Sequence, residues 1–201
     1  MPGVMTRCEW AGAHPLMQRY HDDEWGVPQH EDRALFELLV LEGMQAGLSW
    51  LTVLKKRAAY QEAFENFEPS RVARYGTRKI HQLLGNAGII RNRLKILAAI
   101  RNAQGVLALQ ERHGSVDAFV WQFVDHRPVR NHWKRLKDIP CHSPESAQMS
   151  RALLQQGFAF VGPTICYAFM QATGMVNDHV IGCFRHREIC HDVRGGRAHR
   201  R

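Results

Sequence analysis

Two pairs of metal-ligand residues lie near opposite ends of this chain and restrict how it can fold. Cys8 and His21 are separated by twelve residues, and His179 and Cys183 by three. The second spacing, i to i+4, predicts that both side chains lie on one face of a helix. Two cysteines and two histidines are a set that zinc prefers. If the four residues bind one ion, the fold must bring the two terminal segments together.

The same residues have an ordinary explanation as well. The chain contains twelve histidines and five cysteines, so some pairs with this spacing occur by chance. A buried cysteine without a metal packs as a small hydrophobic residue. Spacing alone therefore leaves both interpretations open.

Length and composition favour one globular domain. A chain of 201 residues with 45% hydrophobic content can bury a core without disulfides. No apolar run approaches the roughly 20 residues that span a bilayer, and the start lacks the pattern of a signal peptide. We expect a cytoplasmic protein, not bound to membranes, with reduced cysteines. Residues 1–190 are expected to form one domain of two packed lobes, followed by a disordered basic tail over 191–201.

The charge of the chain points to a polyanionic partner. The formal net charge is +8, and Lys and Arg side chains give sequence-independent affinity for nucleic-acid phosphates. A basic surface without a specific partner is the alternative.

Helical periodicity runs through most of the chain, and no strand-type alternation is sustained, which predicts an all-α fold. Asp32 is expected to cap the first long helix, and Ser49 to cap the next, which reaches Phe67 and is stopped by Pro69. Residues 126–142 are polar and contain two prolines, so we expect a loop between lobes. Further helices are predicted over 77–86, 91–112 and 115–124.

A helical hairpin is predicted next. Ser143 is suited to cap a helix with Pro144 at its first position, and Gly157 fits the position after its end. A second helix is then predicted from Thr164 to Thr173, and the free amides at its start, beside Gly162 and Thr164, are suited to a DNA phosphate. An ordinary packed hairpin is the alternative.

Four runs of sequence are specific: YHDDEWGVP (20–28), LEGMQAGLSWLTVLKKR (41–57), NAGIIRNRLKI (86–96) and GFAFVGPTICYAFMQATGMVNDHVIGC (157–183). They resemble the DNA-3-methyladenine glycosylase I family, a branch of the helix-hairpin-helix DNA glycosylases, and the resemblance covers about residues 8 to 183.

The resemblance implies an all-α, two-lobed helix-hairpin-helix fold with a base pocket in the cleft. It also implies excision of 3-methyladenine from alkylated double-stranded DNA, with the free base as product, by a protein that we expect to be a monomer. Finally, it implies a structural zinc ion, Zn2+, that joins the terminal segments through Cys8, His21, His179 and Cys183.

Glu42 is the carboxylate that we expect to recognise the base. Methylation at N3 makes adenine cationic and weakens its bond to deoxyribose, so the enzyme mainly has to select the base. An ionised, partly desolvated carboxylate in an apolar helix would hydrogen-bond the flipped base and favour a cation over neutral adenine. Capping or pairing at the end of that helix is the alternative role.

Aromatic residues are expected to supply the other half of selection. Tyr20 and Trp50 resemble the stacking and hydrogen-bonding residues of the family, and a cationic base between such rings gains about 0.5 to 2 kcal/mol of cation-π attraction. Trp10 and Trp25 fit either the pocket wall or the core. Trp121 and Trp133 are expected in the core.

The turn between the first two long helices is a candidate DNA contact. Leu48 is suited to act as an apolar wedge in the space that a flipped nucleotide leaves, and Gly47 would allow close approach of the backbone. A buried leucine between helices is the alternative. The cations at 55–57, 91, 93 and 95 are expected to form solvated faces.

Two departures from the wider superfamily restrict the mechanism. Asn177 stands where many members carry an activating Asp, and Asp178 is expected to orient a ligand histidine instead. Lyase members place a Schiff-base Lys in the hairpin, where this chain has Pro163 and Thr164. The sequence therefore predicts a monofunctional hydrolase that leaves an abasic site. Within the closer family, Met17 replaces a frequent Tyr, which puts stacking at that position in doubt.

Two alternatives of other classes remain. One is a non-catalytic, zinc-stabilised DNA-binding module. The other is a zinc hydrolase whose metal keeps an open position for water, against which a full Cys2His2 set speaks.

Overall fold

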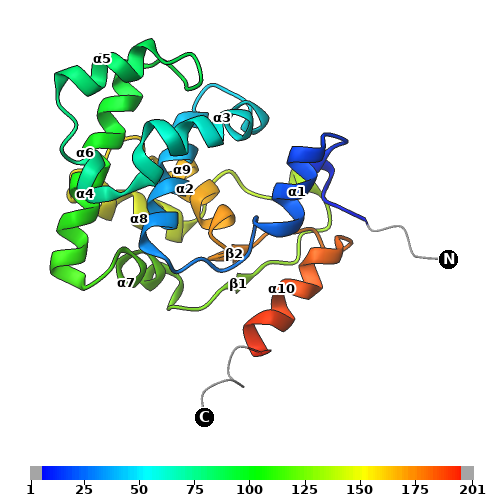
Figure 1. Cartoon of the computed structure of the whole chain (residues 1–201). Coiled ribbons are helices and arrows are strands. Elements are labelled where there is room, and N and C mark those ends of the chain that lie inside the picture. The colour runs from blue at the N-terminus through cyan, green and yellow to red at the C-terminus, as the bar shows by residue number, and fades with distance from the viewer. Residues whose placement is uncertain (1–5, 196–201) are drawn as a thin grey trace.

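The computed structural model of the protein describes residues 6–195, and for residues 190–195 it gives only the course of the helix. The fold is mostly helical, as predicted (Figure 1). The elements in chain order are η1 (Glu9–Ala11), α1 (Pro15–Asp23), α2 (Asp32–Gln45), α3 (Trp50–Ala63), η2 (Glu65–Phe67), α4 (Pro69–Val72), α5 (Thr77–Gly85), α6 (Arg93–His113), α7 (Val116–Trp121), η3 (Gln122–Val124), β1 (Val129–Arg130), η4 (Leu136–Asp138), α8 (Pro144–Gln155), α9 (Pro163–Ala172), β2 (Val176–Asn177) and α10 (Phe184–Gly195).

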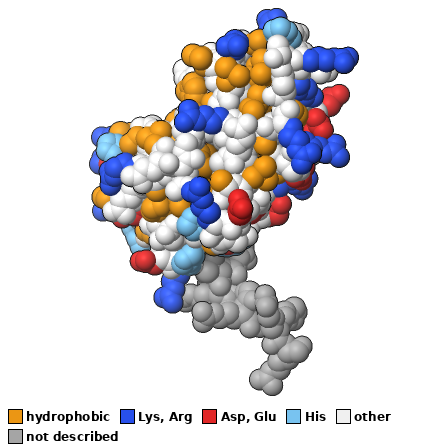
Figure 2. Space-filling view, turned by 90° about the vertical axis from the view of Figure 1, so that its left-hand side faces the viewer, with side chains coloured by type: hydrophobic (Ala, Val, Ile, Leu, Met, Phe, Trp, Pro, Cys, Tyr) orange, Lys and Arg blue, Asp and Glu red, His pale blue; other side chains and the backbone are white. Residues whose placement is uncertain are grey.

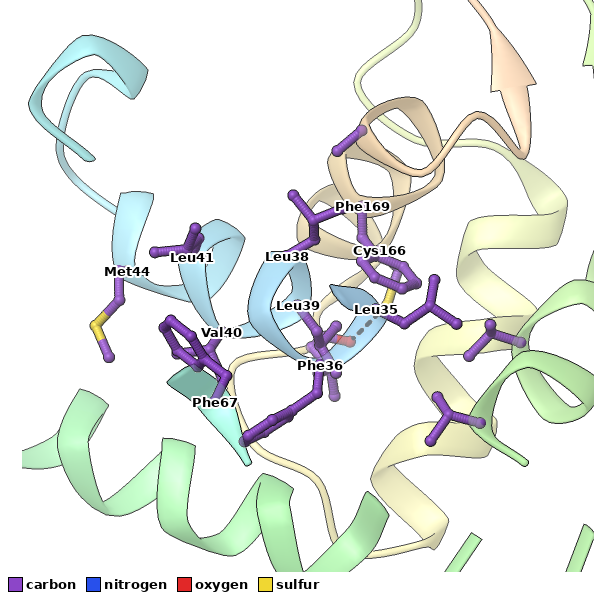
Figure 3. Packing of buried hydrophobic residues seen from close by; sticks show 14 of the residues in the cluster. Leu35, Phe36, Leu38, Leu39, Val40, Leu41, Met44, Phe67, Cys166 and Phe169 are labelled. Atoms are coloured by element: carbon purple, nitrogen blue, oxygen red, sulfur yellow. Dashed lines mark hydrogen bonds between the residues drawn. The ribbon is translucent and has the colours of Figure 1, made fainter. Parts of the chain in front are cut away.

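Helix α2 is the central element of the core. Nine of its residues are buried, so it is apolar on nearly all sides, which is the pattern of a helix surrounded by others. Leu35 and Leu38 lie beside α9, and the Phe36 ring lies 6.1 Å from that of Phe67 (Figure 3). The candidate carboxylate Glu42 is on this helix, so its backbone position is fixed by the core.

The cap of α2 differs from the prediction. Glu31, not Asp32, accepts from the first free amides of the helix, those of Arg33 and Ala34. Asp32 instead accepts from the amides of Val116 and Asp117 at the start of α7. The carboxylate predicted to cap its own helix therefore caps another. The predicted caps at Ser49 and Ser143 are confirmed.

The helix predicted to run on to Phe67 ends earlier. Helix α3 ends at Ala63, and residues 65–67 have left-handed φ values of 52°, 55° and 55°. This reversal stacks the Phe64 and Phe67 rings in the core, with centroids 5.6 Å apart. Pro69 then begins a helix, α4, rather than stopping one, because the first position of a helix needs no amide hydrogen.

The connection from η3 to α8 is mostly irregular, as predicted for residues 126–142, but part of it forms a two-stranded parallel sheet. Val129 in β1 pairs with Val176 in β2, and Arg130 with Asn177. These four residues are a small departure from the predicted all-α fold, in which no sustained strand was expected. The pairing fastens the connection beside the segment that carries His179.

The terminal segments lie side by side. The Phe184 amide at the start of α10 donates to the Thr6 carbonyl over 3.0 Å, and α1 and α10 lie on the same side of the molecule (Figure 1). Helix α10 continues to Gly195 and so reaches into the predicted tail, while 196–201 lie outside the described residues. The division of the domain into two lobes remains a prediction.

Helices α8 and α9 form the predicted hairpin. Gly157 follows α8 with φ of +87°, a conformation that favours glycine. Gly162 is the N-cap residue of α9, which begins at Pro163, one residue before the predicted start.

The cations do not gather on the face that carries α4, α5 and α6. There, Lys and Arg side chains are spread among hydrophobic, neutral and a few acidic ones (Figure 2). In the part of the chain that the structure describes, no helix has the length and apolarity needed to cross a bilayer.

Candidate active site and metal centre

A cavity of about 280 Å³ is lined by residues of the N-terminal segment, of α2 and of further elements. All five residues predicted for base recognition line it: Trp10, Tyr20, Trp25, Glu42 and Trp50. They come from η1, α1, the connection after α1, α2 and α3. The structure thus brings together side chains that are up to 40 positions apart, from position 10 to position 50.

Four buried polar atoms of this cavity have no hydrogen-bond partner among the described residues. They are the indole nitrogens of Trp10 and Trp50, the Tyr20 hydroxyl and Oε2 of Glu42. An unpaired buried polar group is costly, and its presence in a native fold asks for an explanation. A ligand with both donors and acceptors along its edge would satisfy these atoms.

The aromatic rings form a connected wall. The Trp10 ring lies 4.9 Å from Trp25 in an edge-on arrangement, and the Tyr20 ring lies 5.2 Å from Trp50. Such contacts fix the ring planes without filling the space between them. Met17 lines the same cavity. At this position, where stacking was in doubt, the side chain is a flexible thioether and not an aromatic ring.

Burial controls the charge of this site. Desolvation raises the pKa of Glu42 to about 8, so without a cation beside it the carboxyl group is mostly protonated at neutral pH. The expected ionised form, in contact with a cationic base, stays a prediction. Burial, with a contribution from Glu42, also raises the pKa of Tyr20 well above its usual value, so its hydroxyl remains a donor.

The turn after α2 lies at the surface. Leu48 is 42% exposed, which contradicts the alternative of a buried leucine between helices. Gly47 has φ of +78° and is exposed as well. Thr164, at the N-terminus of α9, is also exposed, while Gly162 is partly buried. All four predicted DNA contacts are thus at least partly accessible.

Five further lining residues did not stand out in the sequence. Leu136 lies in η4 and Ile139 directly follows it, in the long connection, where apolar residues in a polar segment were a usable signal. The complete additional set is Gln45, Leu136, Ile139, Ala168 and Gln171. The turn at η4 is closed by an ion pair between Arg135 and Asp138, at 3.0 Å.

The four predicted metal ligands meet in one buried cluster. Their ligand atoms all lie within 4.8 Å of one another. Nδ1 of His179 lies 3.6 Å from the Cys8 sulfur, 3.5 Å from the Cys183 sulfur and 3.2 Å from Nε2 of His21. A tetrahedron with zinc-sulfur and zinc-nitrogen bonds of ordinary length has edges of about 3.3 to 3.8 Å. The cluster therefore fits a zinc ion.

The protonation and orientation of the cluster fit a metal as well. The hydrogen bond with Cys8, and then those with His179 and His21, lower the pKa of Cys183 and favour a thiolate, the form that binds metals. The same hydrogen bond, together with burial, raises the pKa of Cys8, so without a metal one proton is shared by the two sulfurs. Nδ1 of His21 contacts Asp22 at 2.8 Å, and Nε2 of His179 contacts the Trp25 carbonyl at 2.9 Å. The other ring nitrogens, Nε2 of His21 and Nδ1 of His179, lie 3.4 and 3.5 Å from the Cys183 sulfur, on the side where an ion would bind.

The expectation that His179 and Cys183 share one helix face is wrong. Both residues lie in the irregular segment between β2 and α10. Their approach, at 3.5 Å, is set by the turn at Ile181 and Gly182.

Asp178 does not orient a histidine. Its buried carboxylate accepts hydrogen bonds from four neutral donors, at 2.7 to 2.8 Å. The donors are Asn131, Trp133, Tyr167 and Gln171. Asp178 thus joins the long connection to α9. Neither it nor Asn177 lines the cavity, so Glu42 is the one carboxylate among the lining residues that the structure describes.

Comparison with known proteins gives a consistent result. The family model for methyladenine glycosylase matches residues 10–186. DNA-3-methyladenine glycosylase 1 of Escherichia coli (strain K12) is 49% identical over 179 residues, which are 89% of this chain and 96% of that protein. DNA-3-methyladenine glycosylase of Haemophilus influenzae is 44% identical over 180 residues, 90% of this chain and 97% of that protein.

Solved structures agree with the sequence relatives. A crystal structure of 3-methyladenine DNA glycosylase I superimposes with a TM-score of 0.87 at 50% identity, covering 89% of this chain and 98% of that one. A structure from Staphylococcus aureus, described as showing the basis of 3-methyladenine recognition, has a TM-score of 0.87 at 37% identity and covers 90% and 97%.

Proposed function

Because this chain belongs to the methyladenine glycosylase family and is a DNA glycosylase, we propose that it excises 3-methyladenine from alkylated double-stranded DNA by hydrolysis and leaves an abasic site. The observation that carries the proposal is the aromatic cavity with Glu42 as its one carboxylate, whose Oε2 lacks a partner among the described residues. Relatives named for this activity support it.

Recognition follows from the unpaired atoms of the cavity. A flipped base would stack among the rings of Tyr20, Trp50 and Trp10 and replace the missing partners. The indole N–H groups can only donate, so they suit ring nitrogens of the base, whereas Glu42 suits its exocyclic amino group. A carboxylate in a dry site favours a cationic base over neutral adenine, because the charges attract and water does not screen them.

Hydrolysis then needs little help from acid catalysis. The bond between C1′ and N9 breaks with its electron pair going to the base, which leaves neutral because it was a cation. Water forms the new bond at C1′ and loses its proton to solvent. No covalent step with an amine is expected, since Pro163 and Thr164 occupy the hairpin positions where a lysine would act, and we infer that the enzyme does not nick the abasic site.

The exposed residues beside the cavity are suited to hold the DNA. Leu48 would enter the gap that the flipped nucleotide leaves, and Gly47 would allow the backbone to approach the duplex. The free amides at the start of α9, by Gly162 and Thr164, would bind a phosphate, as a helix-hairpin-helix element does. We expect the protein to act as a monomer.

We propose that Cys8, His21, His179 and Cys183 hold one structural zinc ion. Four protein ligands leave no position for water or substrate, so the ion would supply geometry rather than reactivity. It would fasten the segment with Trp10, Tyr20 and Trp25 to the end of the hairpin region. This arrangement argues against a zinc hydrolase.

Release of free base is the direct test. Incubation of the protein with methylated duplex DNA is expected to release 3-methyladenine, which liquid chromatography separates from other bases, without strand cleavage. A non-catalytic DNA-binding module would bind methylated and unmethylated duplexes equally and release nothing. That result would refute the proposed activity, and a nicked product would refute its monofunctional character.

A second prediction concerns the pH dependence of lesion binding, and it follows from the raised pKa of Glu42. Without a bound base this pKa is about 8, and a bound cation lowers it, so the complex holds fewer protons than the free enzyme as the pH approaches 8 from below. Affinity for the lesion, and kcat/KM with it, should therefore rise with pH by up to about tenfold per pH unit and level off above 8. A pH profile at constant ionic strength measures this. Glu42→Gln should give a flat profile, and a flat wild-type profile would contradict the role of the carboxylate.

A further inference from the structure

Lys95 is a buried cation next to the pocket helix. Its side chain lies in α6, where the sequence predicts a solvated face, yet the residue is only 7% exposed. Nζ donates to the Met44 carbonyl over 2.7 Å and to the Ala46 carbonyl over 2.6 Å. A buried ammonium group loses its hydration, so its two acceptors must compensate. The interaction is therefore specific rather than a charge resting on a surface.

The two acceptors mark the end of α2. Carbonyls in the last turn of a helix lack partners within the helix, and a cation there also meets the negative end of the helix dipole. Beyond Ala46 the chain turns through Gly47, closed by a bond of 2.6 Å from the Leu48 amide to the Gln45 carbonyl. Lys95 thus ties the end of the helix that carries Glu42 to the turn that exposes Leu48.

We propose that Lys95 is a positioning residue for base extrusion: it fixes the turn at 46–48 so that Leu48 can enter the duplex when the nucleotide leaves it. This inference rests on the proposed function. Lys95 is absent from the lining of the base cavity, so it acts through the turn and not on the base. Loss of Lys95 should lower the rate of base release from duplex DNA and leave the affinity for the free base unchanged.

The chain contains a matched control for this interaction. Lys56 in α3 also donates from Nζ to two backbone carbonyls, those of Ala87 at 2.9 Å and Gly88 at 3.3 Å. These carbonyls belong to the connection between α5 and α6, and none of the three residues lines the cavity. Lys56→Met removes the same kind of bond from a turn with no assigned role in extrusion.

The experiment compares Lys95→Met, Lys56→Met and Leu48→Ala with the wild type. Wedge insertion is read from the fluorescence of 2-aminopurine placed beside a tetrahydrofuran abasic-site analogue in a duplex. Pocket integrity is read from the affinity for free 3-methyladenine, by tryptophan fluorescence. We expect Lys95→Met to lose the 2-aminopurine response as Leu48→Ala does, and to lower kcat/KM for base release about tenfold, the scale of one hydrogen bond to a charged group. Lys56→Met should match the wild type, and affinity for the free base should stay within about twofold in every variant.

Further variants guard against a general loss of structure. Lys95→Arg keeps the cation and should recover most of the response, and Lys95→Gln replaces Lys95→Met if the latter does not fold. The inference is overturned if Lys95→Met retains the response that Leu48→Ala loses, or if free-base affinity falls together with the response. It is also overturned if Leu48→Ala itself retains the response. Absence of base release by the wild type would instead refute the proposed function.

Discussion

Replacing Glu42 by Gln should lower kcat/KM for release of 3-methyladenine about 100-fold, while the protein remains folded. The substitution keeps the shape of the side chain but removes the charge that would attract the cationic base, and loss of one such electrostatic contact in a dry site costs about 3 kcal/mol. Base release from methylated duplex DNA, measured by chromatography, gives the rate. Equal rates for both proteins would show that Glu42 does not select the lesion.

The same variant has a predicted effect on stability. The pKa of Glu42 is raised by burial from 4.5 to about 8 in the folded state. A group with a raised folded pKa contributes stability below its unfolded pKa and loses it as the pH rises through the folded value. The free energy of unfolding of Glu42→Gln should therefore increase relative to the wild type between pH 4.5 and 8, by at most about 5 kcal/mol. Denaturant titrations at several pH values measure this difference. Glu62→Gln, an exposed position in α3, is the control and should show no such trend.

If the cluster holds zinc as proposed, replacing Cys183 by Ser should remove the ion and lower the free energy of unfolding by about 4 kcal/mol, the range in which loss of a metal site falls among single substitutions. The serine hydroxyl is a poor ligand for zinc, so the cluster would lose the sulfur that its neighbours favour as a thiolate. Metal content per chain and denaturant titration give the two quantities. Activity should fall as a consequence, because the aromatic wall is no longer held.

Cys141→Ser is the matched control for the metal site. Cys141 is a free, exposed cysteine outside the cluster, so its replacement should leave metal content and stability unchanged. Hydrogen exchange should separate local from global effects, since Cys183→Ser is expected to increase exchange around residues 8–25 and 179–189. If Cys183→Ser contains no zinc but is as stable as the wild type, the metal does not support the fold.

The sequence allowed most of the helices to be predicted because their ends carry strong local signals. Ser49 and Ser143 cap helices as expected, and Gly157 ends one. The errors arise where tertiary contacts compete with local preference. Asp32 satisfies the start of α7 rather than its own helix, and the left-handed turn at 65–67 is stabilised by stacking of Phe64 on Phe67, which sequence periodicity does not reveal.

The candidate site was also predictable only where local sequence signals exist. Tyr20, Trp25, Glu42 and Trp50 were identifiable because they lie in runs that resemble a known family, and all four line the cavity. The positions that sequence reasoning missed depend on distant contacts. Lys95 reads as one more surface cation until its carbonyl acceptors on α2 are seen, and Asp178 as a partner of His179 until its four donors are counted. The raised pKa of Glu42 likewise depends on burial, which the sequence does not quantify.

The meeting of the two terminal segments has a consequence for synthesis in the cell. Trp10, Tyr20 and Trp25 leave the ribosome well before His179 and Cys183, which contact His21 of the same segment. A nascent chain therefore has its aromatic wall long before it has the means to fix it. A product that stopped before His179 would carry most of the helical core but would lack the contacts that hold the aromatic wall in place.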